Sequence, residues 1–185
     1  MRELIIGGDG RVGMALRRHL PAAEWTTRRR QGPQSPQDEV DQYSRAMGTL
    51  PAKYHFDLLE RGPLPAADIV YICAGVNGAL TCSQNAQISY RTNVDGTIYV
   101  AEHYRDKAFV VWVSSTTVEW QMEHYGHQKR ITETVLRAMP HGGIVRAGRV
   151  LQPEIDDLCR MMIRVGRERD RNIVLWNEDE KPYSG

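Results

Sequence analysis

Residues 2–16 read RELIIGGDGRVGMAL, and this stretch decides the fold. Residues 4–6 form a short apolar run, which is typical of a buried parallel strand. Four glycines follow, at Gly7, Gly8, Gly10 and Gly13. Apolar residues then recur at helical spacing as far as Leu20. The stretch therefore predicts a strand, a glycine-rich turn and a helix.

A strand, a glycine turn and a helix together form the phosphate-binding unit of dinucleotide-binding folds. The early glycines let backbone turn tightly and approach a pyrophosphate, and the last lets the helix lie close to the strand. The helix start offers N–H donors and a positive dipole end. We expect a side chain at Gly10 to collide with the pyrophosphate or to spoil a positive φ.

The glycines fit two registers. Gly8, Gly10 and Gly13 match G-x-G-x-x-G, whereas Gly7, Gly10 and Gly13 match G-x-x-G-x-x-G. The alternative is an ordinary glycine-rich turn without a ligand, because short motifs carry a real false-positive risk.

The whole chain sets broad limits on function. Its 185 residues fit one domain with a sizeable core. A net charge of +1 indicates neither nucleic acid nor an anionic membrane as a partner. The three cysteines lack metal-type spacing, which favours reduced thiols in a cytoplasmic protein. No apolar run approaches membrane-spanning length, and the chain begins with a strand rather than a signal peptide. His124 and His127 alone do not make a metal site.

The second predicted strand, residues 23–27, leads into three arginines. In a nucleotide-binding unit the end of this strand meets the adenosine ribose. An acid there binds the 2′-OH of NAD, whereas Arg accommodates the 2′-phosphate of NADP. Thr27, Arg28 and Arg29 contain no acid, so the sequence favours NADP. The alternative is a solvated arginine cluster.

The next segments predict less regular structure. Residues 31–51 are rich in proline and glutamine and predict a surface loop, with a short helix over residues 39–47. Residues 54–57 are consistent with a short third strand. Asp57 at its end either contacts an adenine or caps the turn that follows.

A clear buried strand at residues 68–73 runs into Ala74 and Gly75, small residues that leave room for a ligand at a strand end. Residues 84–104 then predict one long helix. Asn93 lies in the middle of this helix, where asparagine is mildly unfavourable. Gly96 is also unusual there and indicates close helix packing.

A further buried strand, residues 108–113, ends in four hydroxyl residues, Ser114 to Thr117. Tyr125 and Lys129 follow, and their spacing puts both side chains on one helix face. A tyrosine hydroxyl titrates near ~10, and a neighbouring ammonium favours its phenolate. Such a tyrosine can exchange a proton with an alcohol or carbonyl oxygen during hydride transfer, while a Ser or Thr hydroxyl holds that oxygen.

These motifs occur in the order found in short-chain dehydrogenases/reductases. The chain resembles the extended type that acts on nucleotide sugars, the NAD(P)-dependent epimerase/dehydratase group, and most closely the dTDP-4-dehydrorhamnose reductases and sugar epimerases. The resemblance covers about residues 3–153. It selects the register Gly7, Gly10, Gly13. It implies a Rossmann-type α/β fold, a doubly wound parallel sheet with helices on both faces in a three-layer sandwich.

The resemblance also implies roles for individual residues. Tyr125 is the general acid/base, and Lys129 lowers its pKa and binds the nicotinamide ribose. Thr116 positions the substrate oxygen, with Ser115 as the rival, and Asn93 supports the site. The residues implied in cofactor binding are Gly7, Gly10, Arg11, Val12, Gly13, Thr27, Arg28, Arg29, Asp57, Leu58, Ala74, Gly75 and Lys129.

The resemblance predicts an NADP(H)-dependent oxidoreductase acting on a sugar nucleotide or similar polar carbonyl compound. We expect residues 1–185 to form one NAD(P)-binding domain, with residues 151–185 as a remnant of the substrate-binding region. Members of this group usually continue beyond this length, so two alternatives stay open. One is a catalytically silent NAD(P)-binding sensor or partner-binding protein. The other is an enzyme whose pocket is completed by another subunit.

The helices at residues 84–104 and 125–139 carry apolar residues on more than one face. One face must cover the sheet, and the surplus needs another partner. In the resembling family two such helices pair with their copies across a twofold axis. We therefore expect a homodimer through these helices. The alternative is a monomer with scattered exposed apolar side chains.

Overall fold

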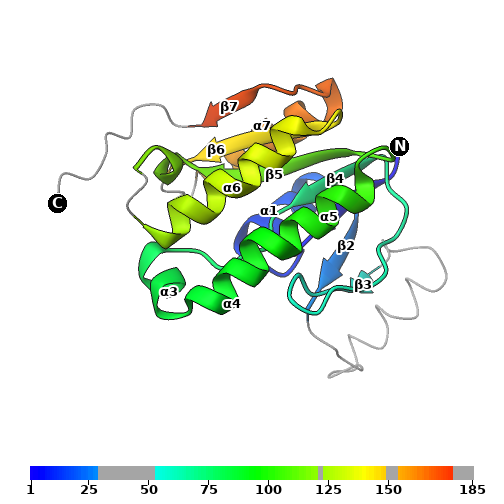
Figure 1. Ribbon diagram of the computed structural model, residues 1–185. Helices are drawn as coiled ribbons and strands as arrows, with labels where there is room; N and C mark the ends of the chain where they lie inside the picture. The colour runs from blue at the N-terminus through cyan, green and yellow to red at the C-terminus, as the bar shows by residue number, and fades with distance from the viewer. Residues whose placement is uncertain (29–52, 121–122, 149–153, 177–185) are drawn as a thin grey trace.

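The structure is a computed structural model that describes residues 1–28, 53–120, 123–148 and 154–176 (Figure 1). Within this part of the chain, seven strands form one parallel sheet in the order β3-β2-β1-β4-β5-β6-β7. The strands are β1 (Glu3–Ile6), β2 (Glu24–Thr27), β3 (Lys53–His55), β4 (Ile69–Ile72), β5 (Phe109–Ser115), β6 (Gly142–Ala147) and β7 (Ile173–Trp176). The strand order reverses between β1 and β4, the position where open α/β sheets bind ligands.

Helices cover both faces of the sheet, with α5 and α6 on one side and α1 and α7 on the other (Figure 1). The helical elements are α1 (Arg11–His19), α3 (Ala79–Gln84), α4 (Ala86–Tyr90), the π-helical segment η1 (Arg91–Gly96), α5 (Thr97–Tyr104), the 3₁₀ helix η2 (Thr116–Trp120), α6 (His124–Ala138) and α7 (Ile155–Glu168). The predicted doubly wound, three-layer α/β fold is therefore confirmed.

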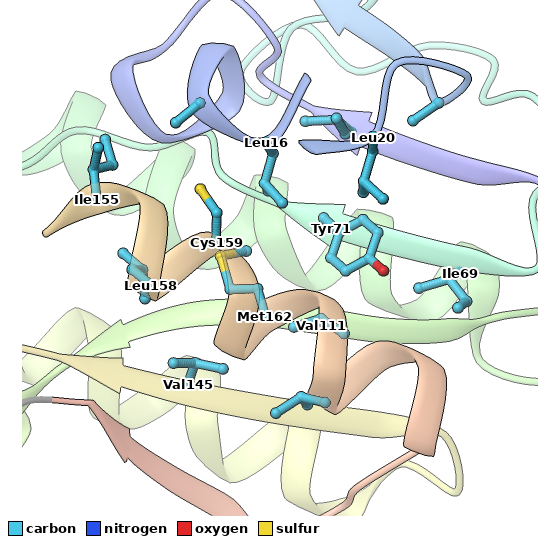
Figure 2. Close-up of a cluster of buried hydrophobic side chains, with 14 of the residues drawn as sticks. Leu16, Leu20, Ile69, Tyr71, Val111, Val145, Ile155, Leu158, Cys159 and Met162 are labelled. Carbon is cyan, nitrogen blue, oxygen red and sulfur yellow. The ribbon is translucent and has the colours of Figure 1, made fainter. Parts of the chain in front are cut away.

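Two apolar cores lie on the two faces of the sheet. Figure 2 shows the first, in which Leu16 of α1 and Met162 of α7 pack over Tyr71 of β4 and Val111 of β5. The second lies under α5 and α6 and includes Trp112 of β5. Neighbouring residues of one strand thus enter opposite cores. This explains why these strands read as continuous apolar runs rather than as an alternating pattern.

Most of the predicted elements are confirmed. The helix predicted over residues 84–104 runs without a break from Ala86 to Tyr104 through α4, η1 and α5, but its middle, η1, is π-helical, and Gln84 belongs to the separate helix α3. Two residues of η1 explain the departure. The Asn93 side chain bonds to the backbone of Val76, and Gly96 packs so closely that a Cβ there would overlap the carbonyl oxygen of Leu58. Strand β5 also runs two residues further than expected, to Ser115.

The predicted loop at residues 31–51 lies outside the described residues. Residues 154–176, within the segment expected to be a substrate-region remnant, form α7 and β7 of the sandwich. Among the helices that the structure describes, each is too short or too polar to cross a membrane.

Candidate active site

The glycine turn joins three elements by backbone contact. Gly7 has a φ of 84°, in the left-handed region that favours glycine, and a Cβ there would lie 2.7 Å from the Cβ of Ala74. A Cβ on Gly13 would overlap the carbonyl oxygen of Gly7. A Cβ on Gly8 would lie 2.7 Å from the Trp25 ring. Glycine at these positions therefore lets β1, α1 and the end of β4 meet.

Gly10 has a different role from the one expected. It is the N-cap of α1 with a φ of −74°, so the expectation of a positive φ at Gly10 is wrong, and that conformation belongs to Gly7. A Cβ on Gly10 would meet one atom within 4 Å, the Gly7 carbonyl oxygen at 3.3 Å. The first turn of α1 contains no acidic residue, and no side chain hydrogen-bonds to its cap. This open helix start fits a dinucleotide pyrophosphate.

The two residues after Gly10 differ in their surroundings. Arg11 is exposed at the start of α1, whereas Val12 is half-buried and packs against the first core. Arg11 is therefore placed to meet a ligand at the turn through its side chain.

The end of β2 lies against the glycine turn. Gly7 N donates to Thr26 Oγ1 at 3.0 Å, and the Thr27 hydroxyl donates to the carboxylate of Asp9. Arg28 is exposed directly after the strand, and Arg29 lies outside the described residues. The sequence contains no acid at the tip of β2, but the fold brings Asp9 there from the glycine turn.

Asp57 and Leu58 follow β3. Asp57 Oδ1 accepts a hydrogen bond from the backbone N–H of Leu59 at 2.7 Å, so the carboxylate caps this turn. The Leu58 side chain is buried in the second core against Gly96. Of the two roles expected for the Asp57 side chain, the structure shows the capping one.

The end of β4 is clamped by Asn93. Asn93 Oδ1 accepts from Val76 N at 2.7 Å, and Asn93 Nδ2 donates to Val76 O at 2.9 Å. A Cβ on Gly75 would lie 3.0 Å from Asn93 Oδ1, so a side chain at this position would crowd the clamp. The structure thus brings together Ala74, Gly75 and Asn93, which the sequence analysis had linked only by resemblance.

The hydroxyl residues after Val113 differ in their surroundings. Ser114 is buried, and its hydroxyl has no hydrogen-bond partner within the described part of the chain. Ser115 ends β5, and its Oγ accepts from Thr117 N at 3.2 Å and from Thr117 Oγ1 at 2.9 Å. Thr116 begins η2 and is half-buried. Both rivals for the substrate-positioning role thus lie at the carboxyl end of β5.

Tyr125 and Lys129 lie one turn apart at the start of α6, as predicted. Tyr125 Oη donates to Asn77 Oδ1, in the loop after β4, at 3.4 Å. Lys129 is buried, and its Nζ donates to the carbonyl oxygen of Val113 at 2.9 Å. Nζ lies 4.4 Å from the Trp112 ring centre and 5.5 Å from the Tyr125 ring centre. α6 therefore connects the carboxyl ends of β4 and β5.

Burial controls the ionisation of this pair. It raises the pKa of Tyr125 above its usual value, and it lowers the pKa of Lys129 to about 8. The expectation that Lys129 lowers the Tyr125 pKa is therefore wrong for this structure. Desolvation of the phenol is the largest effect on this pKa, and the nearby Cys82 thiol raises it further.

Several residues at the site were not found from the sequence. Gln128 lies inside the Tyr-x-x-x-Lys spacing, is 2% exposed and bonds to Asn93. Asn77 faces the Tyr125 hydroxyl, and Asp9 bonds to Thr27. For Gln128, the sequence signal was a glutamine on the buried side of the predicted helix, where a polar side chain needs a partner. No group of three or more metal-ligating side chains occurs within the described ranges.

The profile of the NAD dependent epimerase/dehydratase family matches residues 4–142. This segment contains the glycine turn, Asn93, Tyr125 and Lys129. The chain belongs to this family. The predicted relationship to extended short-chain dehydrogenases/reductases is confirmed, and the epimerase/dehydratase family is one of NAD(P)-dependent enzymes.

Solved structures share the fold at low sequence identity. A hypothetical dTDP-4-dehydrorhamnose reductase from Sulfolobus tokodaii has a TM-score of 0.70 at 15% identity, covering 95% of this chain and 76% of that one. The UDP-Glc/GlcNAc 4-epimerase from Campylobacter jejuni has a TM-score of 0.70 at 14% identity, covering 94% and 76%. Pen from Bacillus thuringiensis has a TM-score of 0.60 at 18% identity, covering 80% and 49%.

This member of the epimerase/dehydratase family therefore spans about half the length of Pen and about three quarters of the other two proteins. At these identities the likeness shows the fold. A search of curated proteins found no match.

Proposed function

We propose that the chain is an NAD(P)(H)-dependent oxidoreductase that exchanges hydride with a carbonyl or alcohol carbon of a sugar nucleotide or similar polar substrate. One observation carries the proposal. α6 places Tyr125 and Lys129 at the carboxyl ends of β4 and β5, next to the β1 glycine turn and the reversal of strand order. The reductase and epimerase that share this fold support the substrate class.

The proposed cofactor site is formed by the glycine turn and the end of β4. Backbone N–H groups at the start of α1, next to Gly10, bind the pyrophosphate. Ala74 and Gly75 place no large side chain at the end of β4, beside the clamp that Asn93 forms. When bound, the nicotinamide supplies the carbon that gives or takes the hydride.

The proposed proton donor to the substrate oxygen is the Tyr125 hydroxyl. A tyrosine phenol is protonated at neutral pH, so it can donate this proton to a carbonyl oxygen in the direction of reduction. Thr116, or its rival Ser115, holds the same oxygen by a hydrogen bond. Lys129 binds the nicotinamide ribose, and Asn93 supports the loop after β4.

The test is oxidation of NADPH and NADH by the purified chain with a panel of dTDP- and UDP-4-keto sugars. We expect turnover that Tyr125→Phe and Lys129→Met each reduce by about 10²–10⁴-fold, the usual contribution of a positioned proton donor. The matched control is Tyr90→Phe, which removes a hydroxyl from the exposed part of α4 and should leave the rate unchanged. Cofactor binding without turnover would instead support the catalytically silent alternative.

We propose a preference for NADP over NAD through Arg28, with Arg29 as its neighbour in sequence. A charge-assisted contact to the 2′-phosphate is worth roughly 1.5–3 kcal/mol, or about ten- to a hundredfold in affinity. The Asp9 carboxylate at the same strand end opposes this preference by like-charge repulsion. Arg28→Ala with Arg29→Ala should therefore lower, and Asp9→Asn raise, the ratio of NADPH to NADH affinity in titrations. Unchanged ratios would contradict the assignment.

We also propose a homodimer through the outer faces of α4, α5 and α6. Ile88 is 52% exposed and Tyr90 is 40% exposed on α4, and Ile98 and Val135 are half-buried on the other two helices. A twofold interface would cover these side chains. Light scattering at tens of micromolar should give a dimer that charged substitutions at Ile98 and Val135 dissociate. A monomer, or a dimer insensitive to both changes, would refute this interface.

A further inference from the structure

Gln128 connects α6 to the loop after β4. It lies between Tyr125 and Lys129 and is 2% exposed, so both ends of its amide need partners inside the protein. Its Oε1 accepts from Asn93 Nδ2 at 2.8 Å, and its Nε2 donates to Ser89 Oγ at 2.9 Å. Both partners belong to the helical segments that follow α3.

These linked hydrogen bonds fix the orientation of the Asn93 and Gln128 side-chain amides. The Val76 peptide offers an N–H and a carbonyl to Asn93, which fixes which way the Asn93 amide points. The second N–H of Asn93 must then find an acceptor, which is the carbonyl oxygen of Gln128 at 2.8 Å, while Cys82 Sγ lies further from Asn93 Nδ2, at 3.7 Å. The Gln128 amino group donates to Ser89, whose hydroxyl can donate onward to the carbonyl oxygen of Ala86.

We propose that Gln128 is a positioning residue. It holds the Asn93 amide, and through Asn93 it fixes the Val76 loop relative to Tyr125 and Lys129. The distance between the cofactor-binding loop and the proton-transfer group is then set by buried hydrogen bonds between side chains. The consequence for hydride transfer rests on the proposed function, whereas the positioning itself does not.

The direct test is amide hydrogen exchange at Val76, measured by NMR on the cofactor-free chain. Gln128→Met keeps the length of the side chain but removes both hydrogen bonds. We expect it to accelerate Val76 exchange by about tenfold or more, the effect of about 1.4 kcal/mol. The matched control is Thr132→Val. Thr132 is 0% exposed on the same helix and its hydroxyl donates to the backbone oxygens of Asn93 and Gln128 rather than to their amide side chains.

The exchange rates of the Val76 amide in the two variants decide whether Gln128 positions the loop. Accelerated exchange in Gln128→Met but not in Thr132→Val supports the proposal. Unchanged exchange in a folded Gln128→Met variant, or equal acceleration in the control, overturns it. If Gln128→Met does not fold, Ser89→Ala decides, because it removes only the outer partner of Gln128. Here faster Val76 exchange supports the proposal, and unchanged exchange overturns it.

Catalysis gives an independent readout. Gln128→Met should lower kcat by about ten- to a hundredfold, the cost of a small misplacement, with little change in the substrate KM. Gln128→Glu keeps an oxygen that can accept from Asn93 and should restore most of the rate. A Thr132→Val variant should keep the wild-type kcat even if its Tm is as low as that of Gln128→Met. Faster Val76 exchange in a chain without any turnover would refute the proposed function and leave the positioning role standing.

Discussion

The ion pair between Glu133 and Arg146 should stabilise the fold much more than an ordinary surface pair. Arg146 Nε and Nη2 donate to the two Glu133 carboxylate oxygens at 2.8 and 2.7 Å, in bidentate geometry. The Glu133 side chain is 5% exposed and that of Arg146 is 16% exposed. Arg146 also contacts Glu119 at 3.2 Å, so one guanidinium ties α6, β6 and η2 together.

Removing one partner leaves the other charge buried and unpaired. Such a change typically costs about 3–5 kcal/mol, because the remaining ion loses its compensation. For a domain of this size about 1 kcal/mol shifts Tm by roughly 2–4 °C, so Arg146→Met should lower Tm by about 6–20 °C. The pKa of Arg146 is raised chiefly by its hydrogen bonds to Glu133, which agrees with a strongly coupled pair.

The assay is thermal unfolding followed by circular dichroism. The control is Arg105→Met, which breaks the exposed pair that Arg105 forms with Glu102 at 2.7 Å and should shift Tm only slightly. Replacing both buried partners, Glu133→Leu with Arg146→Met, should recover a large part of the loss, because no unpaired charge remains. An Arg146→Met shift no larger than that of the control would refute the reasoning.

Three further predictions concern the cofactor site, its lysine and its loop. Gly10→Val should lose NADPH affinity in titrations and lower Tm less than Gly13→Ala, because a Cβ on Gly10 would lie 3.3 Å from Gly7 O, whereas a Cβ on Gly13 would overlap that oxygen. The pKa of Lys129 is lowered from 10.5 to about 8, so the unfolded chain binds more protons between these values. Denaturant titrations should then show wild type gaining up to roughly 3 kcal/mol over Lys129→Met as pH rises from 8 to 10.5, and no gain would contradict the burial of a neutral amine. Gly75→Ala should lower NAD(P)H affinity, because its Cβ would lie 3.0 Å from Asn93 Oδ1, and unchanged affinity would show that the clamp can move.

The fold could be predicted because its signals are local. Apolar runs mark the strands, and the four glycines mark the first turn. The pairing of Tyr125 with Lys129 could be predicted for the same reason, since four residues make one helical turn. The position of Asn93 near the end of β4 came from family resemblance rather than from any local pattern.

The parts that were missed depend on contacts between distant residues. Asn93 bonds to Val76, 17 positions away, and to Gln128, 35 positions away. Spacing along one helix contains no information about either bond. The raised pKa of Tyr125 was missed for a similar reason, because burial depends on the elements packed over the side chain. Asp9 reaches Thr27 only after β1 and β2 have paired.

The π-helical segment lets this helix hold one residue more than a regular α-helix would between the same two ends. Each residue of an α-helix turns the chain by about 100°, and a π-helical turn accommodates one residue more than an α-helical turn. The extra residue within Arg91–Gly96 is therefore absorbed locally, so that Asn93 faces Val76 while Val100 and Tyr104 stay in the core. A chain with one residue fewer there would form regular α-helix with its two ends in nearly the same orientation. Homologues should therefore gain or lose one residue at this point of the helix more readily than elsewhere along it.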